Sequence, residues 1–99
     1  MAEARKIKWS QWSPGEGMIR CGEADYRTLM TWMVELGRDA KKCLDAQEKS
    51  HAIYGRVLHD GDGLVTEFRF YCDTYCDDEE LDEHARHNPY DTFYVVHKS

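Results

Sequence analysis

The chain has 99 residues, of which 41% are hydrophobic and 32% are charged, and its formal net charge is −6 at pH 7. This length predicts one domain, residues 1–99. The acidic balance disfavours direct contact with nucleic acid, and no apolar run approaches the roughly 20 residues that cross a membrane.

The N-terminal residues and the cysteine content bear on the cellular compartment. No apolar segment typical of a secretion signal follows the first six residues. Four cysteines without such a signal are typical of reduced thiols. The sequence therefore predicts a cytoplasmic protein, with Cys21 and Cys43 in its core.

The first predicted elements are two short strands. Residues 6–12 alternate loosely between polar and apolar side chains, residues 13–17 contain a proline and two glycines, and residues 18–21 form a second apolar stretch. We expect these segments to pair. Trp9 and Trp12 are three residues apart, so they point to opposite faces of the strand and at least one is available for contact with a partner.

Residues 25–47 are predicted to form one long amphipathic helix, because apolar residues recur at spacings of three and four. Asp25 is the expected N-cap. Gly37 lies within the apolar stripe and indicates either close approach of another element or a kink. The stripe comprises Tyr26, Leu29, Met30, Met33, Gly37, Ala40, Leu44 and Gln47, and it is widened by Trp32, Leu36 and Cys43.

The next segment has the pattern of a hairpin. Residues 52–58 and 64–72 read as strands, and the Asp-Gly pairs between them are typical of a turn. We expect one face of the second strand to point to the core, namely Leu64, Thr66, Phe68, Phe70 and Cys72.

The remaining residues predict a short acidic helix over 74–88, which ends at Asn88-Pro89, and a final strand over 91–97. The predicted fold is therefore α+β. A mostly antiparallel sheet, in the order β-β-α-β-β-α-β, packs on one long central helix, and the short acidic helix completes the chain.

The charge is concentrated in residues 73–83, which hold seven acids and no base, whereas the rest of the chain holds thirteen bases and twelve acids. This block is typical of a solvated helix face. It is also typical of a docking surface for a basic protein partner, or of a mimic of DNA phosphates. On the docking interpretation, the partner-binding residues are Asp77, Asp78, Glu79, Glu80, Asp82 and Glu83, together with Trp9 and Trp12.

Residues 72–87 also contain a pattern of metal-ligand types. The predicted acidic helix has few apolar residues, so something else is needed to hold it. Two thiols ahead of the helix and two imidazoles on it would supply the four ligands of a structural zinc ion. The alternative is that the thiols pack as small apolar groups and the imidazoles interact with the helix C-terminus. The four residues are Cys72, Cys76, His84 and His87.

No sequence motif for catalysis or phosphate binding is evident. The sequence therefore predicts a small, acidic, non-enzymatic protein-binding module without a cofactor. We expect a regulator or inhibitor of the kind carried by phages and mobile elements, acting on a host protein. The alternatives are a structural module that binds one zinc ion and a subunit of a homo-oligomeric assembly that pairs through an edge strand.

Overall fold

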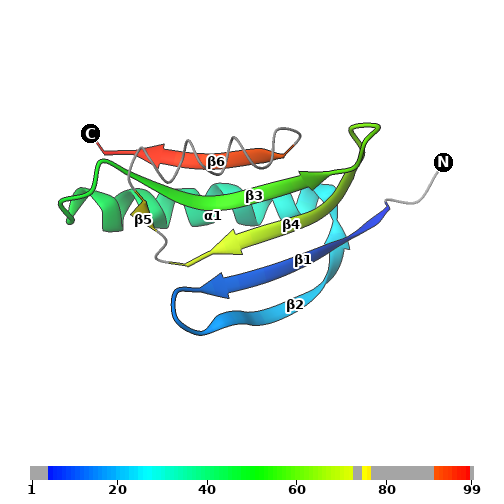
Figure 1. Cartoon of the computed structure of the whole chain (residues 1–99), viewed down its shortest axis with the longest axis horizontal. Helices are drawn as coiled ribbons and strands as arrows, with labels where there is room; N and C mark the ends of the chain where they lie inside the picture. The colour runs from blue at the N-terminus through cyan, green and yellow to red at the C-terminus, as the bar shows by residue number, and fades with distance from the viewer. Residues whose placement is uncertain (1–4, 73–74, 77–90, 99) are drawn as a thin grey trace.

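The computed structural model describes residues 5–72, 75–76 and 91–98 (Figure 1). The chain is α+β, as predicted. The predicted second helix over 74–88 lies outside the described residues except at Tyr75–Cys76, where the prediction is wrong because the chain forms a strand. The elements are β1 (Lys6–Ser13), β2 (Gly17–Asp25), α1 (Tyr26–Asp45), β3 (His51–His59), β4 (Val65–Tyr71), β5 (Tyr75–Cys76) and β6 (Thr92–His97).

In the described residues the strands form one mixed sheet. Its order is β2-β1-β4-β3, and both β6 and the short β5 also pair with β3. The β1 and β4 strands run parallel, whereas the other pairs are antiparallel. Figure 1 shows β1 and β4 side by side, although β2, α1 and β3 separate them in sequence. The predicted antiparallel character therefore holds for the hairpins and not for this central pair.

Helix α1 lies behind the sheet in Figure 1 and packs mainly against β3 and β6. Asp25 is its N-cap, as predicted: Asp25 Oδ1 accepts a hydrogen bond from the Thr28 backbone N–H at 2.7 Å. This bond lowers the pKa of the Asp25 carboxyl below its ordinary value. The cap satisfies one of the N–H groups that the first helical turn leaves without a partner.

The core lies between α1 and the sheet. Leu29 and Met33 supply the helix side, and both are almost completely buried. Among the described residues, no helix is both long enough and apolar enough to cross a membrane. The remaining members of this cluster come from β1, β3 and β4, namely Ile7, Val57, Phe68 and Phe70.

Gly37 marks a close approach between α1 and the sheet, which was one of its two predicted roles. A Cβ atom at Gly37 would lie 2.9 Å from the ring of Tyr54. Only glycine, which has no side chain, therefore allows the ring to pack against the helix backbone at this point. Burial raises the pKa of the Tyr54 phenol above its ordinary value.

Several predicted core positions are wrong. Leu64 is 53% exposed because β4 begins one residue later, and Thr66 is also exposed, whereas Phe68 and Phe70 are buried as expected. A register shift between Leu58 and His59 changes the pairing at this end of the hairpin. Exposed positions that were expected in the core or in the helix stripe are Cys21, Cys43, Tyr26, Trp32 and Gln47.

Candidate functional site

Trp9 and Trp12 lie on opposite faces of β1, as their spacing predicted. Trp9 packs toward α1 at the margin of the core cluster. Trp12 lies on the other face, where its indole N–H donates to Ser10 Oγ at 2.7 Å. The two tryptophans of this strand therefore belong to two different surfaces.

The Trp9 surface contains a pocket with a volume of about 390 Å³ at the junction of α1 with the sheet. We call it the Trp9–Trp32 pocket. Four of its residues come from one stretch of α1, and the others come from β1, β2 and β4. The lining residues are Trp9, Gln11, Arg20, Trp32, Glu35, Leu36, Asp39 and Phe70.

Aromatic rings form the apolar part of this pocket. The rings of Trp9 and Trp32 meet edge to face, with centroids 5.3 Å apart, and Trp32 also meets Phe70 at 6.1 Å. Gly22 on β2 lies directly against Trp9, since a Cβ atom there would be 3.0 Å from the indole ring. These contacts hold the Trp9 ring at the wall of the pocket.

The sheet side of the pocket carries one positive charge. The Arg20 guanidinium lies 5.8 Å from the Trp9 ring centroid, and Arg20 Nε donates to Gln11 Oε1 at 2.9 Å. Gln11 in turn donates through Nε2 to Cys72 Sγ at 2.9 Å. Arg20 is therefore held on the sheet by a ring and an amide, without a carboxylate partner among the described residues.

The helix side carries two negative charges. Glu35 and Asp39 are four residues apart on α1, so their side chains leave the same face of the helix. Neither carboxylate has a hydrogen bond or ion pair with any residue that the structure describes. Further along α1, by contrast, the Asp45 carboxylate forms an ion pair with Lys41 at 3.1 Å.

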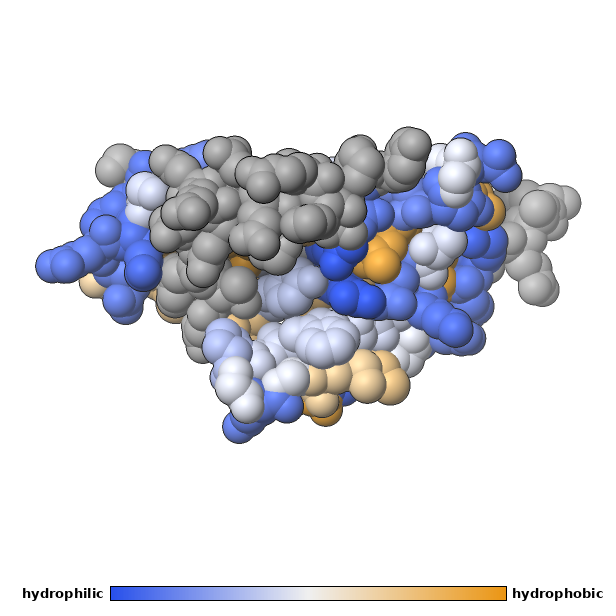
Figure 2. Space-filling model, in the orientation of Figure 1, coloured by the Kyte–Doolittle hydropathy of each residue, from blue (hydrophilic) through white to orange (hydrophobic). Residues whose placement is uncertain are grey.

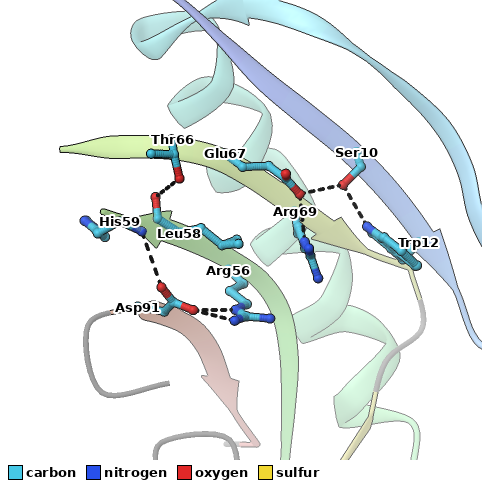
Figure 3. Close-up of polar contacts among 9 residues, drawn as sticks. All are labelled: Ser10, Trp12, Arg56, Leu58, His59, Thr66, Glu67, Arg69 and Asp91. Carbon is cyan, nitrogen blue, oxygen red and sulfur yellow. Dashed lines mark hydrogen bonds and ion pairs between the residues drawn. The ribbon is translucent and has the colours of Figure 1, made fainter. Parts of the chain in front are cut away.

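The opposite face of the sheet carries a polar network (Figure 3). Glu67 Oε2 accepts from Arg69 Nε at 2.7 Å and from Ser10 Oγ at 3.4 Å. The Arg69 guanidinium lies 5.3 Å from the centroid of the Trp12 ring. Burial opposes the charge of Arg69, but the hydrogen bond and the charge of Glu67 outweigh it and raise the pKa of Arg69.

A second ion pair lies beside this network. Arg56 is opposite Arg69 in the β3–β4 register, and its guanidinium binds the Asp91 carboxylate, which also accepts from the His59 backbone N–H (Figure 3). Arg56 also lies 5.4 Å from the Phe93 ring centroid. Each of the two neighbouring guanidinium groups already has its own carboxylate, so this face reads as an internal structural network.

Only part of the predicted zinc set can be placed. Cys72 is half-buried and accepts the Gln11 hydrogen bond, and the backbone of Cys76 pairs with His51 in the β3–β5 register. His84 and His87 lie outside the described residues. The described residues contain no group of three or more metal-ligand side chains, and this set remains a prediction.

The predicted acidic contact residues also lie outside the described part of the chain. They are Asp77, Asp78, Glu79, Glu80, Asp82 and Glu83. Of the predicted partner-binding residues the structure therefore places Trp9, in the pocket, and Trp12, on the polar face.

Sequence reasoning missed most of the pocket. The spacing of Glu35 and Asp39 was readable, but nothing in the sequence indicated that they face Arg20 and Phe70 across a pocket. That arrangement depends on the parallel pairing of β1 with β4 and on where α1 crosses the sheet. Comparisons with family models, with curated proteins and with solved structures found no match.

Proposed function

We propose that this chain is a small, non-enzymatic module that binds another protein through the Trp9–Trp32 pocket and regulates or inhibits that partner. The observation that carries the proposal is a pocket of about 390 Å³ with two tryptophans in its wall. Its volume falls within the roughly 300–1,000 Å³ of typical ligand pockets. Tryptophan is also among the residues that contribute most to binding energy at protein interfaces.

The exposure of the pocket rim supports the same proposal. Trp32 is 38% exposed although it lies on the helix beside the core. An exposed indole next to a concave surface is typical of an anchor that a partner covers on binding, because its burial removes a large apolar area from water.

The experiment begins with affinity capture of a partner by the immobilised chain and continues with titration calorimetry of the purified pair. Trp32→Ala is expected to weaken binding about tenfold or more, the range of an interface hot spot. Val34→Ala is the matched control, because Val34 is exposed on the same helix and does not line the pocket. Equal affinities for the two variants, or failure to capture any partner, would refute the proposal.

The acidic block provides a second test of partner binding. Reversing Glu79, Glu80 and Glu83 to Lys is expected to slow association with a basic partner without unfolding the domain. If this charge-reversed variant binds the partner as the natural chain does, the acidic block is not part of the contact surface, and the pocket alone remains as the proposed site.

An assembly subunit is the second candidate, because β2 is a nine-residue strand at the edge of the sheet that the described strands form. Among the described strands β2 pairs with β1 alone, and Met18 and Ile19 on it are 53% and 43% exposed. Figure 2 shows a pale to orange surface over the β1–β2 hairpin at the lower side of the molecule. An unpaired, partly apolar edge can add a strand from a second copy.

This second candidate has a simple geometric test. Antiparallel pairing of two β2 strands about their midpoint would place Cys21 opposite Cys21 of the second copy, and Cys21 is exposed with a free thiol. Mild oxidation is then expected to cross-link a dimer that light scattering already detects, and Ile19→Lys is expected to abolish both signals. A monomer at all concentrations would refute it.

A further inference from the structure

We infer that the Trp9–Trp32 pocket recognises a basic side chain, an arginine or a lysine, presented by the protein partner. This inference rests on the proposed function and names the chemistry of the contact. It follows from three features of the pocket: its aromatic wall, its carboxylates and the position of its own arginine.

The aromatic wall suits a cation. The ring faces of tryptophan attract guanidinium and ammonium groups within about 6 Å of the ring centroid. The pocket already contains one such contact, since the Arg20 guanidinium lies 5.8 Å from the Trp9 centroid. Trp32 and Phe70 extend the aromatic surface beyond this contact.

The carboxylates supply the complementary charge. Glu35 and Asp39 stand together on the helix side, and neither is paired with a described residue. An aromatic surface beside carboxylates that no described residue pairs favours a ligand with an apolar stem and a positively charged tip. Arginine and lysine side chains have this form.

Arg20 does not cancel this charge. Two carboxylates and one guanidinium line the pocket, so the acids exceed the base by one. Arg20 is hydrogen-bonded to Gln11 on the sheet side, whereas both carboxylates lie on α1. An incoming cation therefore meets the helix wall, and Arg20 remains on the sheet wall.

The whole chain favours the same kind of partner. Its net charge of −6 and the seven acids of residues 73–83 would raise the encounter rate with a basic surface. An anionic ligand bound to Arg20 is the opposite expectation, and the experiment distinguishes the two.

The test titrates the folded chain with three small probes and follows the tryptophan indole N–H signals by NMR. The probes are N-acetyl-arginine amide, the uncharged isostere N-acetyl-citrulline amide and N-acetyl-glutamate amide. We expect the arginine probe to bind about tenfold more tightly than the citrulline probe, the gain of a partly desolvated cation–π contact with a carboxylate nearby. The shifts are expected at Trp9 and Trp32, while Trp12 on the opposite face serves as an internal control.

Charge-neutral variants complete the test. Glu35→Gln with Asp39→Asn is expected to remove the preference for arginine over citrulline. Asp62→Asn with Glu48→Gln removes the same charge at exposed positions that do not line the pocket, and is expected to retain the preference. Equal binding of arginine and citrulline, preferential binding of the glutamate probe, or shifts as large at Trp12 would each overturn the inference.

The outcomes also separate this inference from the proposed function. If Trp32→Ala weakens the captured partner but no probe prefers the pocket by its charge, the module binds a protein without a basic anchor. If the arginine probe binds but Trp32→Ala does not change the affinity for the partner, the pocket is a cation site outside the partner interface.

Discussion

The sulfur atom of Met33 packs directly against the backbone of Gly55, so that a Cβ atom on Gly55 would lie 1.9 Å from it. Met33 is only 1% exposed and is part of the core between α1 and β3. This contact decides how closely the helix approaches the centre of the sheet.

Gly55→Ala is therefore expected to lower the free energy of unfolding by about 1–3 kcal/mol, because overpacking forces a buried side chain out of its place. Urea denaturation checks this. Gly61→Ala is the control, since its Cβ would meet nothing within 4 Å. The double variant Gly55→Ala with Met33→Ala is expected to lose less free energy of unfolding than the two single variants added together. The reason is that shortening the Met33 side chain removes its clash with the new Cβ atom. Additive losses would contradict the packing argument.

The Arg56–Asp91 ion pair is mostly buried, with side chains 15% and 11% exposed. Asp91→Asn is expected to cost about 1.5–3 kcal/mol, the range for hydrogen bonds to charged groups. The same change in the exposed Lys41–Asp45 pair, Asp45→Asn, is expected to cost less than about 1 kcal/mol. Thermal denaturation of both variants compares the two pairs, and equal losses would show that burial does not matter here.

The N-cap makes a prediction about pH. The folded-state pKa of Asp25 lies below its ordinary value of 3.8, mainly because the carboxylate accepts the Thr28 backbone N–H. Its stabilising effect is complete well above that value and is lost as the pH falls through the folded-state pKa. The stability difference between the natural chain and Asp25→Ala is thus expected to narrow as the pH falls below about 4.

Denaturation curves from about pH 7 to about pH 3 measure this difference. Asp25→Asn is the control, because asparagine caps a helix as well but does not titrate. A difference between Asp25→Ala and the natural chain that stays constant over this range would contradict the role of the charged carboxylate.

The zinc hypothesis predicts one metal ion per chain in native mass spectrometry of protein purified without a tag or chelator. Cys76→Ser is expected to remove that ion and to lower the melting temperature, because loss of a structural metal ligand removes binding free energy that holds the fold. Cys43→Ser is the control, since Cys43 is exposed on α1. If the natural protein contains no metal, the zinc hypothesis is contradicted, and Cys72 and Cys76 act as packing residues.

The sequence by itself determined the features that depend on neighbouring residues. The apolar spacing of residues 25–47 and the acidic cap at Asp25 predicted α1, because helical periodicity and capping act within a few residues. The β1–β2 and β3–β4 hairpins followed from turn residues and alternation for the same reason. Burial could not be predicted in the same way from the apolar character of a side chain. Cys21, Cys43 and Leu64 are apolar and were expected in the core, but they are exposed.

Only the tertiary structure decided the mixed sheet and the pocket. Parallel pairing joins β1 to β4 across more than fifty residues of chain and places Gln11 opposite Phe70. Local propensity carries no information about such pairing, because a parallel pair joins strands that a long crossover connection separates in sequence. The packing of α1 on that sheet then brought Glu35 and Asp39 to the same pocket as Trp9 and Arg20. The pocket forms only when these elements, which are distant in sequence, pack together. No single stretch of the sequence could therefore predict it.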